Sequence, residues 1–163
     1  MLSNTVQDAM NAQINHELYS AYLYLSMSAQ CEAQNLGGFA SWLRLQSQEE
    51  LSHALKFFDF VNDRGGRAVL KAIDQPPAEF KSPLALFQQV LEHERKVTGL
   101  IHQLYALAVK ENDYAAQVEL QWFITEQVEE EKTAGQIVDQ LKMMGDQPGA
   151  LFLMDRQLGQ RAA

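Results

Sequence analysis

The stretch QEELSH, residues 48–53, places Glu50 and His53 three positions apart within a long segment of helical periodicity. Residues three apart lie on the same face of a helix, so both side chains should point in the same direction. Further along that face the residues are apolar, with Leu43 before the pair and Phe57 after it. The stretch therefore predicts a helix that carries a carboxylate and an imidazole on its core-facing side.

Three other long stretches have the same periodicity, and turn-forming residues are concentrated between them. Ser82-Pro83 is typical of a helix start, with a capping serine followed by a proline at the first helical position. The expected helices run over about residues 3–34, from Gly37-Gly38 to Arg64, over about 83–111 and over about 113–144, followed by a short tail helix at about 148–159. We therefore expect an all-α protein.

The lengths of the connections predict how the helices are arranged. Connections of a few residues make the first two helices an antiparallel hairpin, and likewise the next two. The link over about residues 65–82 contains Pro76-Pro77 and can extend to ~60 Å, which exceeds the ~42 Å length of a helix of about 28 residues. We expect residues 1–163 to form a single domain, a four-helix bundle with one long crossover connection and a short fifth C-terminal helix.

On each long helix, one stripe of residues should face the bundle axis. Every stripe is apolar at both ends and polar near its middle. The polar positions on the four stripes are Glu17, Glu50 with His53, Glu94, and Gln127 with Glu130. Two other histidines, His93 and His102, lie off the stripe of the third helix and are expected at the surface.

The polar positions keep one spacing in both hairpins. Glu17 precedes Glu50 by 33 residues, and Glu94 precedes Gln127 by 33. In each hairpin another polar residue follows three positions later. Two antiparallel hairpins with this spacing should bring all six side chains to about the same level in the interior.

Such a layer has two interpretations. Buried polar residues can set the register of a bundle, but here that interpretation must account for four glutamates with no Lys or Arg on any stripe. Two like charges ~4 Å apart repel by ~4 kcal/mol at an effective dielectric constant of ~20, and burial adds a desolvation cost. Protonation would relieve part of this repulsion, whereas bound cations would relieve it and add chemistry. We therefore interpret the layer as a metal site.

Carboxylates with one imidazole and no thiolate suit iron or manganese. Di-iron carboxylate bundles take one Glu from each of two helices and a Glu-x-x-His motif from each of the other two. The chain has one intact motif, and the second ends in a glutamate instead of a histidine. One iron should therefore bind Glu17, Glu50 and His53. The other should bind the bridging Glu50 with Glu94 and Glu130, and Gln127 should be a weak ligand or a hydrogen-bond partner. A less constrained second iron favours storage over a permanent cofactor.

Composition excludes several other classes of protein. With 21 acidic and 13 basic residues, the formal net charge of −8 opposes binding to nucleic acid and suits attraction of cations. The single Cys31 allows neither an intrachain disulfide nor a CxxC metal site. No signal peptide or membrane span is readable, so we expect a cytoplasmic protein without a membrane partner.

Three motifs carry a family resemblance: NHELYS at residues 15–20, QEELSH at 48–53, and the segment from LQWF to EQVEEE at 120–131. At these motifs, and over nearly its whole length, the chain resembles the non-haem ferritins of bacteria and archaea. The resemblance implies a ferritin-like bundle whose ferroxidase centre oxidises Fe(II) with O2 or H2O2. It further implies a homo-oligomeric shell of 24 subunits that stores ferric mineral, and so a role in iron storage and detoxification.

The resemblance also implies roles outside the two main ion sites. Glu49, Glu126 and Glu129 match a third iron site, and Tyr24 matches a tyrosine that assists oxidation. Each of the three glutamates is a sequence neighbour of an expected ligand but points about 100° away around its helix. By the same resemblance, the tail helix should pack with tail helices of neighbouring subunits at the four-fold axes of the shell.

Three alternatives remain open. A bacterioferritin-like protein would bind haem through a methionine that follows the glutamate of the first motif, where this chain has Leu51, and its second motif would end in histidine, where this chain has Glu130. Both differences argue against haem. A di-iron enzyme acting on an organic substrate would need a substrate pocket, and no loop insertions are seen. A purely structural bundle would bind no metal.

Overall fold

The helix pattern of the sequence is realised almost residue for residue. The computed structural model describes residues 1–163 and contains five helices and no strand. The helices are α1 (Asn4–Ala33), α2 (Gly37–Asp63), α3 (Pro83–Lys110), α4 (Tyr114–Met144) and α5 (Pro148–Leu158). Their ends differ from the expected ones by at most one residue, and the predicted fold class is confirmed. None of the helices is both long and apolar enough to span a lipid bilayer.

Capping residues and asparagines explain where the helices begin and where the chain turns between them. Three long helices have a side-chain cap, since Ser3, Ser82 and Asp113 each accept a hydrogen bond from a backbone N–H three residues on. The two short connections contain Asn35 and Asn112 in the left-handed region, with φ of 59° and 54°. Asparagine tolerates this conformation better than most residues, so both hairpins turn in the same way.

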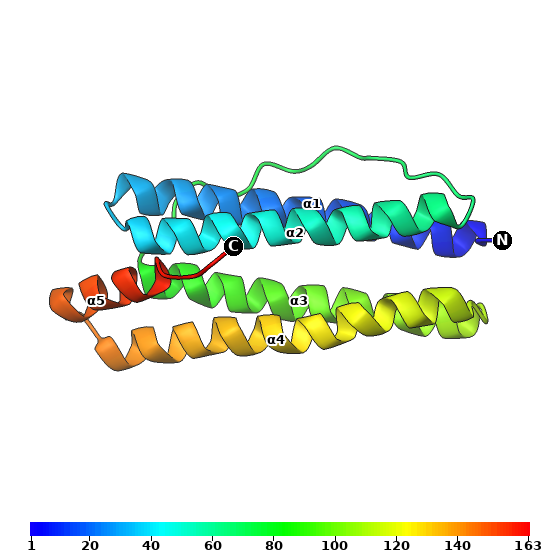
Figure 1. Cartoon of the computed structure of the whole chain (residues 1–163). Helices are drawn as coiled ribbons and strands as arrows, with labels where there is room; N and C mark the ends of the chain where they lie inside the picture. The colour runs from blue at the N-terminus through cyan, green and yellow to red at the C-terminus, as the bar shows by residue number, and fades with distance from the viewer.

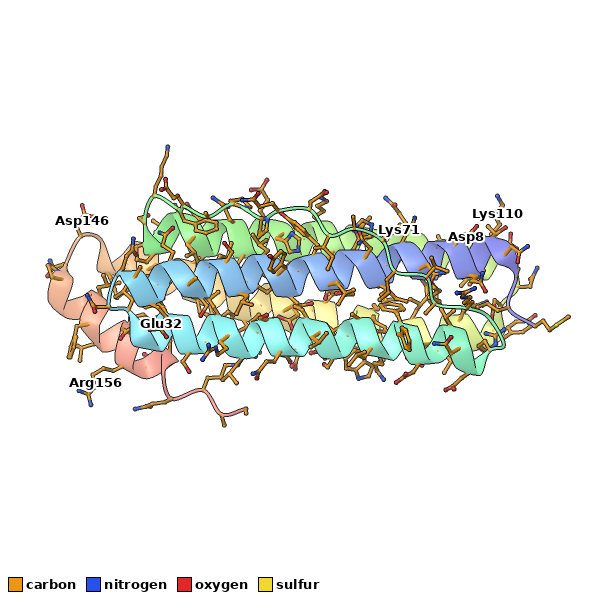
Figure 2. The ribbon with its side chains drawn as sticks, turned by 90° about the horizontal axis from the view of Figure 1, so that it is seen from above. Asp8, Glu32, Lys71, Lys110, Asp146 and Arg156 are labelled. Atoms are coloured by element: carbon orange, nitrogen blue, oxygen red, sulfur yellow. The ribbon has the colours of Figure 1, made fainter.

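The two hairpins are joined by a connection that runs the length of the molecule. Figure 1 shows α1 and α2 side by side, α3 and α4 below them, and the crossover passing along α1 from one end to the other. Polar side chains of α1 hold this segment: Asn11 bonds to Arg67, and Gln30 bonds to both backbone groups of Phe80. In Figure 2, Lys110 at the end of α3 lies at the same end of the bundle as the start of α1.

The core is divided into two apolar clusters, one of 18 and one of 12 buried residues. Phe39 and Phe87 belong to the first, which also includes side chains from α5, and their rings lie 5.7 Å apart. Phe57 and Phe123 stack in the second, with ring centroids 4.0 Å apart. Buried polar side chains lie between the clusters, as the stripes predict. The apolar clusters at both ends of the bundle therefore stabilise the fold against the unfavourable burial of the polar layer between them.

Helix α5 docks on the first turn of α2 within the same chain. The carboxylate of Asp155 accepts hydrogen bonds from the backbone N–H of Gly38 at 2.9 Å and of Phe39 at 3.0 Å. It thereby caps α2, whose own N-cap residue, Leu36, has no side-chain acceptor. A Cβ on Gly38 would overlap the carbonyl of Asp155, so glycine permits this close approach. The chain after α5 then runs back along α2, as Figure 1 shows.

Candidate metal centre

Six polar side chains from four helices meet between the two apolar clusters. They are Glu17 of α1, Glu50 and His53 of α2, Glu94 of α3, and Gln127 and Glu130 of α4. All six are buried, and the most accessible of them is only 7% exposed. Each lies on the core-facing stripe of its helix, so helical periodicity alone is enough to direct it inward.

The structure brings together the residues expected for each of the two ion sites. One group consists of Glu17, Glu50 and His53, and the other consists of Glu50, Glu94 and Glu130. Within each group, one potential ligand atom per residue lies within 4.8 Å of the others. Because Glu50 belongs to both groups, its carboxylate is placed to bridge two ions.

The carboxylates of the layer have neutral hydrogen-bond donors and no Lys or Arg partner. Gln13 donates to Oε1 of Glu17 at 2.8 Å, but Oε2 of Glu17 is buried without any partner. Gln46 donates to Oε1 of Glu50 at 3.2 Å and to Oε2 of Glu130 at 2.7 Å. An unpartnered carboxylate oxygen in the interior is costly, and a cation is the ligand that it fits.

Burial and mutual repulsion raise the pKa of the clustered carboxyls. Burial raises the pKa of Glu50 well above its ordinary value, and the charges of Glu94 and Glu130 raise it further. Burial, followed by repulsion from Glu50, has the same effect on the pKa of Glu17. The pKa of Glu130 rises to about 8, with burial again the largest cause. Without metal the layer therefore retains protons near neutral pH, and divalent cations can replace them.

Tyr24 and Gln127 fix the carboxylate of Glu94. The buried hydroxyl of Tyr24 donates to Oε1 of Glu94, while the amide of Gln127 donates to Oε2 at 3.1 Å and to the backbone oxygen at 3.2 Å. Burial raises the pKa of Tyr24 well above its usual range, and the charge of Glu94 adds to the shift, so the phenol keeps its proton. Gln127 acts here as a hydrogen-bond donor, which is one of the two roles expected for it.

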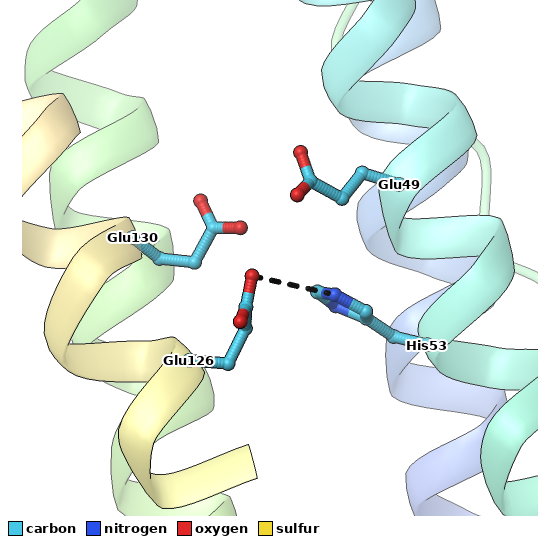
Figure 3. Close-up of side chains that lie close together, drawn as sticks. All are labelled: Glu49, His53, Glu126 and Glu130. Carbon is cyan, nitrogen blue, oxygen red and sulfur yellow. Dashed lines mark ion pairs between the residues drawn. The ribbon is translucent and has the colours of Figure 1, made fainter. Parts of the chain in front are cut away.

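A third group lies beside the layer and includes Glu49, His53, Glu126 and Glu130. Figure 3 shows the four side chains converging from α2 and α4. His53 lies between this group and the layer, because its Nδ1 is 3.3 Å from Glu50 and its Nε2 is 4.0 Å from Glu126. One imidazole therefore faces both sites. Glu49 and Glu126 are only partly buried, so the group is accessible from the surface.

The structure groups the auxiliary carboxylates differently from what the resemblance implies. Glu49 and Glu126 are close together as expected, but their neighbours are His53 and Glu130, and Glu129 is exposed and outside the group. The reason is helical geometry. Glu130 lies one turn beyond Glu126 on the same face of α4, whereas Glu129 is rotated by about 100° from Glu130 toward solvent.

His93 is half-buried rather than fully at the surface, whereas His102 is exposed as expected. The Nε2 atom of His93 lies 2.7 Å from Oγ of Ser20, and its ring meets the ring of Tyr24 edge-on at 5.8 Å. Burial, together with the charge of the nearby Lys96, lowers the pKa of His93 to about 4. This neutral imidazole packs behind the tyrosine that holds Glu94, at the contact between α1 and α3.

Three residues without a predicted role surround the centre. Gln13 and Gln46 each lie one turn before an expected ligand, on the same helix face, so the i, i+4 spacing is a signal that points to them. Arg161 lies in the C-terminal tail and donates to Gln46 and Glu49. No local pattern predicts this contact, because it depends on how α5 docks.

Known proteins resemble this chain in both sequence and structure. The family model described as ferritin-like domain matches residues 7–144. A bacterial non-heme ferritin of Bacteroides fragilis is 46% identical over 161 residues, which cover 99% of this chain and all of that protein. The crystal structure of an open pore ferritin from the archaeon Archaeoglobus fulgidus is 49% identical, with a TM-score of 0.98 over 99% of this chain and all of the other.

Proposed function

Since the chain belongs to the ferritin family and stores iron, we propose that it oxidises Fe(II) at the buried layer between its two apolar clusters. One Fe(II) binds to Glu17, Glu50 and His53, and the other binds to Glu50, Glu94 and Glu130. The shared carboxylate of Glu50 holds the two ions side by side. Each group offers hard oxygen ligands, and only the first adds an imidazole, a donor set that suits iron.

The observation that carries this proposal is the buried Oε2 atom of Glu17, which has no hydrogen-bond partner. Its other oxygen is held by Gln13, so the carboxylate is already oriented toward Glu50 and His53. A structural role would favour a fully satisfied carboxylate, because unsatisfied buried acceptors destabilise a fold by ~1–3 kcal/mol each. A ligand role explains why one oxygen remains available.

The reaction balances over two iron ions. Each Fe(II) gives up one electron, and O2 takes up the two electrons and two protons to become H2O2. When H2O2 is the oxidant, the same two electrons and two protons yield two molecules of water. The carboxyls release protons when the ions bind, because their raised pKa values leave them protonated beforehand.

The two ion sites differ in a way that suits storage. The first includes His53, whereas the second has only carboxylates, with Gln127 and Tyr24 engaged in holding Glu94. At the second site Gln127, the counterpart of the first glutamate of a Glu-x-x-His motif, holds Glu94 instead of binding the ion, so this ion is the less constrained of the two. Tyr24 is fully buried and contacts Glu94, which places it to position this ligand during turnover.

A third iron binds at the auxiliary site formed around Glu49 and Glu126. Burial raises the pKa of Glu126, and the charges of Glu49 and Glu129 add to the shift, which puts Glu129 close to this site. Three of the four residues in this group are carboxylates, which favour Fe(III), so this site is suited to accept oxidised iron on its way out. Haem is not part of the proposal. Leu51, at the position where a bacterioferritin has its haem-ligating methionine, offers no sulfur.

The storage form is a homo-oligomeric shell, for which the resemblance suggests 24 subunits. Exposed apolar residues support association, since Tyr22, Leu25 and Leu51 lie together on the outer face of α1 and α2 around one open pocket. Phe152 and Leu153 on α5 are also exposed. Sedimentation should give one large species, and a chain that ends at Gly145 should form a looser one.

A di-iron enzyme for organic substrates is the second candidate, and nothing in the main cavities favours it. The cavity at the corner of α4 and α5 has a volume of about 360 Å³ and is lined by residues such as Leu84, Leu141 and Leu151. No ligand of the layer lines it.

Anaerobic titration with Fe(II) followed by air tests the proposed function. The protein should bind at least two Fe(II) per chain, oxidise them, and then retain many more ions in soluble form. Binding of two ions without further retention would favour the organic-substrate enzyme instead. No specific binding would leave only a structural bundle.

A further inference from the structure

Arg161 in the C-terminal tail is fixed by three contacts with α2. One guanidinium nitrogen lies 2.5 Å from Oε2 of Glu49, and the other donates to Oε1 of Gln46 at 2.8 Å. The guanidinium also lies over the ring of Trp42, 4.7 Å from its centroid. A side chain that is contacted in three ways is held in one position, although it belongs to the last three residues of the chain.

The docking of α5 explains why the tail reaches this position. Asp155 caps the start of α2, and the buried Met154 and Leu158 pack in the same apolar cluster as Trp42. Arg161 follows Leu158 by three residues, and its backbone N–H still donates to the carbonyl of Leu158. The tail therefore has little freedom until the contacts of Arg161 are broken.

The two hydrogen bonds of Arg161 to side chains lead to the proposed iron ligands, and a third, longer one reaches the backbone oxygen of Trp42 at 3.5 Å. Glu49 is a member of the auxiliary group with His53, Glu126 and Glu130. Gln46 accepts from Arg161 with its oxygen and donates with its amide to Glu130 and Glu50. Arg161 fixes which end of the Gln46 amide faces the layer, because a guanidinium can only donate.

We propose that Arg161 is a built-in cation which occupies the auxiliary site at Glu49 until an iron ion enters and displaces it. This inference rests on the proposed function, because it requires metal at the auxiliary site. An ion among Glu49, His53, Glu126 and Glu130 would lie close to the guanidinium, and the two positive charges would repel each other. The guanidinium then leaves Glu49, and the tail separates from α2.

The ion pair is weak enough to be displaced. The side chains of Arg161 and Glu49 are 26% and 35% exposed, and ion pairs of this kind change a competing equilibrium by only about fivefold or less. The binding of a metal ion to several carboxylates and an imidazole is stronger than this ion pair. The tail therefore reports whether the auxiliary site is filled, and when Arg161 leaves, Gln46 is free to release Glu130.

Binding of Zn(II), which has no redox chemistry, to the full-length protein provides the first test. The variant Arg161→Gln should bind the third Zn(II) about two- to fivefold more tightly, and the affinities for the first two ions should change less, because their ligands contact Arg161 only through Gln46. Arg156→Gln is the matched control, because Arg156 carries the same charge on α5, is exposed, and pairs with no carboxylate. Equal third-ion affinity in the wild type and Arg161→Gln would overturn the inference.

Hydrogen exchange of residues 159–163 provides a second readout that does not depend on activity. The backbone N–H groups of Gln160 and Arg161 are hydrogen-bonded, so release of the tail should speed their exchange. Three Zn(II) per chain should cause this in the wild type, and Glu49→Gln should cause it without metal. Exchange that metal does not change would refute displacement even if the affinities differed.

The experiments distinguish a failure of the proposed function from a failure of the role of Arg161. If the wild type binds no Zn(II) or Fe(II), the proposed function fails and the inference fails with it. If the wild type binds three ions and oxidises iron, but either readout is unaffected by Arg161→Gln or by metal, only the role of Arg161 is wrong.

Discussion

Gln13 donates a hydrogen bond to Oε1 of Glu17 at 2.8 Å, while Oε2 of the same buried carboxylate has no partner at all. The glutamine fixes the direction of the carboxylate without neutralising its charge. Glu50 and His53 complete the group to which Glu17 belongs and which could hold a metal ion. The chain thus holds a carboxylate in position although one of its buried oxygens stays unsatisfied.

The variants Glu17→Gln and Glu50→Gln should differ in how many ion sites they disable. Glu17→Gln should lower the affinity for one Fe(II) by more than about tenfold, a loss that changes around metal ligands commonly cause. The other ion site should keep its affinity. Glu50→Gln should lower the affinity of both sites, because Glu50 is shared. Anaerobic titration counts the ions, and stopped-flow absorbance follows their oxidation.

The matched control is Glu92→Gln, which removes an exposed carboxylate of α3 and should change neither binding nor oxidation. A folded Glu50→Gln protein that oxidises its first two Fe(II) at the wild-type rate would remove Glu50 from the centre.

Stability of the iron-free protein should fall as the pH rises from 6.5 to 8. The pKa of Glu130 is raised from 4.5 to about 8, so between these values the folded protein holds a proton that the unfolded chain has lost. The free energy of unfolding then decreases by at most about 1.4 kcal/mol per pH unit for each such carboxyl. His93, whose pKa is lowered from 6.5 to about 4, acts in the opposite direction only below pH 6.5.

Denaturant unfolding at several pH values measures this slope. Glu130→Gln should flatten it, whereas Glu92→Gln should not, and saturation with Zn(II) should raise stability most at the higher pH. Stability that increases steadily from pH 6.5 to 8 without metal would mean that the layer carries no raised carboxyl pKa.

Haem binding should be absent when the protein is produced with ample haem. Leu51 occupies the position at which a bacterioferritin-like protein would need a methionine, and a leucine side chain cannot ligate iron. The absorption spectrum of the purified protein tests this. A Soret band at one haem per two subunits that disappears on replacement of a methionine would contradict the assignment.

The auxiliary site should depend on Glu126 more than on Glu129. Glu126 belongs to the third ligand group, whereas Glu129 is exposed beside it. We expect Glu126→Gln to lower the affinity for the third ion by about tenfold or more, and Glu129→Gln to lower it by only a few-fold. The triple change of Glu49, Glu126 and Glu129 to Ala should alter the oxygen consumed per iron after the first turnover. Wild-type stoichiometry and turnover in the triple variant would rule out the site.

The sequence predicts the fold and the composition of the layer because both depend on spacing. A helix puts Glu50 and His53 on one face whatever surrounds them, and equal spacing in two hairpins puts Glu17 level with Glu94. Apolar residues on both sides of each polar position mark it as buried. These relations need only the helical period and the lengths of the connections.

What the sequence does not predict depends on packing between elements that are distant in the chain. Arg161 reaches Glu49 only because Asp155 binds the first turn of α2, and no periodic pattern encodes that contact. His93 lies off its stripe, yet the close approach of α1 brings Ser20 to its ring. In both cases a contact between segments that are far apart in the chain decides which side chains meet.

Diffraction from crystals grown with Fe(II) without oxygen, recorded on both sides of the iron absorption edge, tests the central claim most directly. The anomalous map should show one iron among Glu17, Glu50 and His53 and a second among Glu50, Glu94 and Glu130, both within about 2.0–2.4 Å of oxygens of the Glu50 carboxylate. Iron found only at exposed acids, or a single buried ion without contact to Glu50, would contradict a dinuclear centre in this layer.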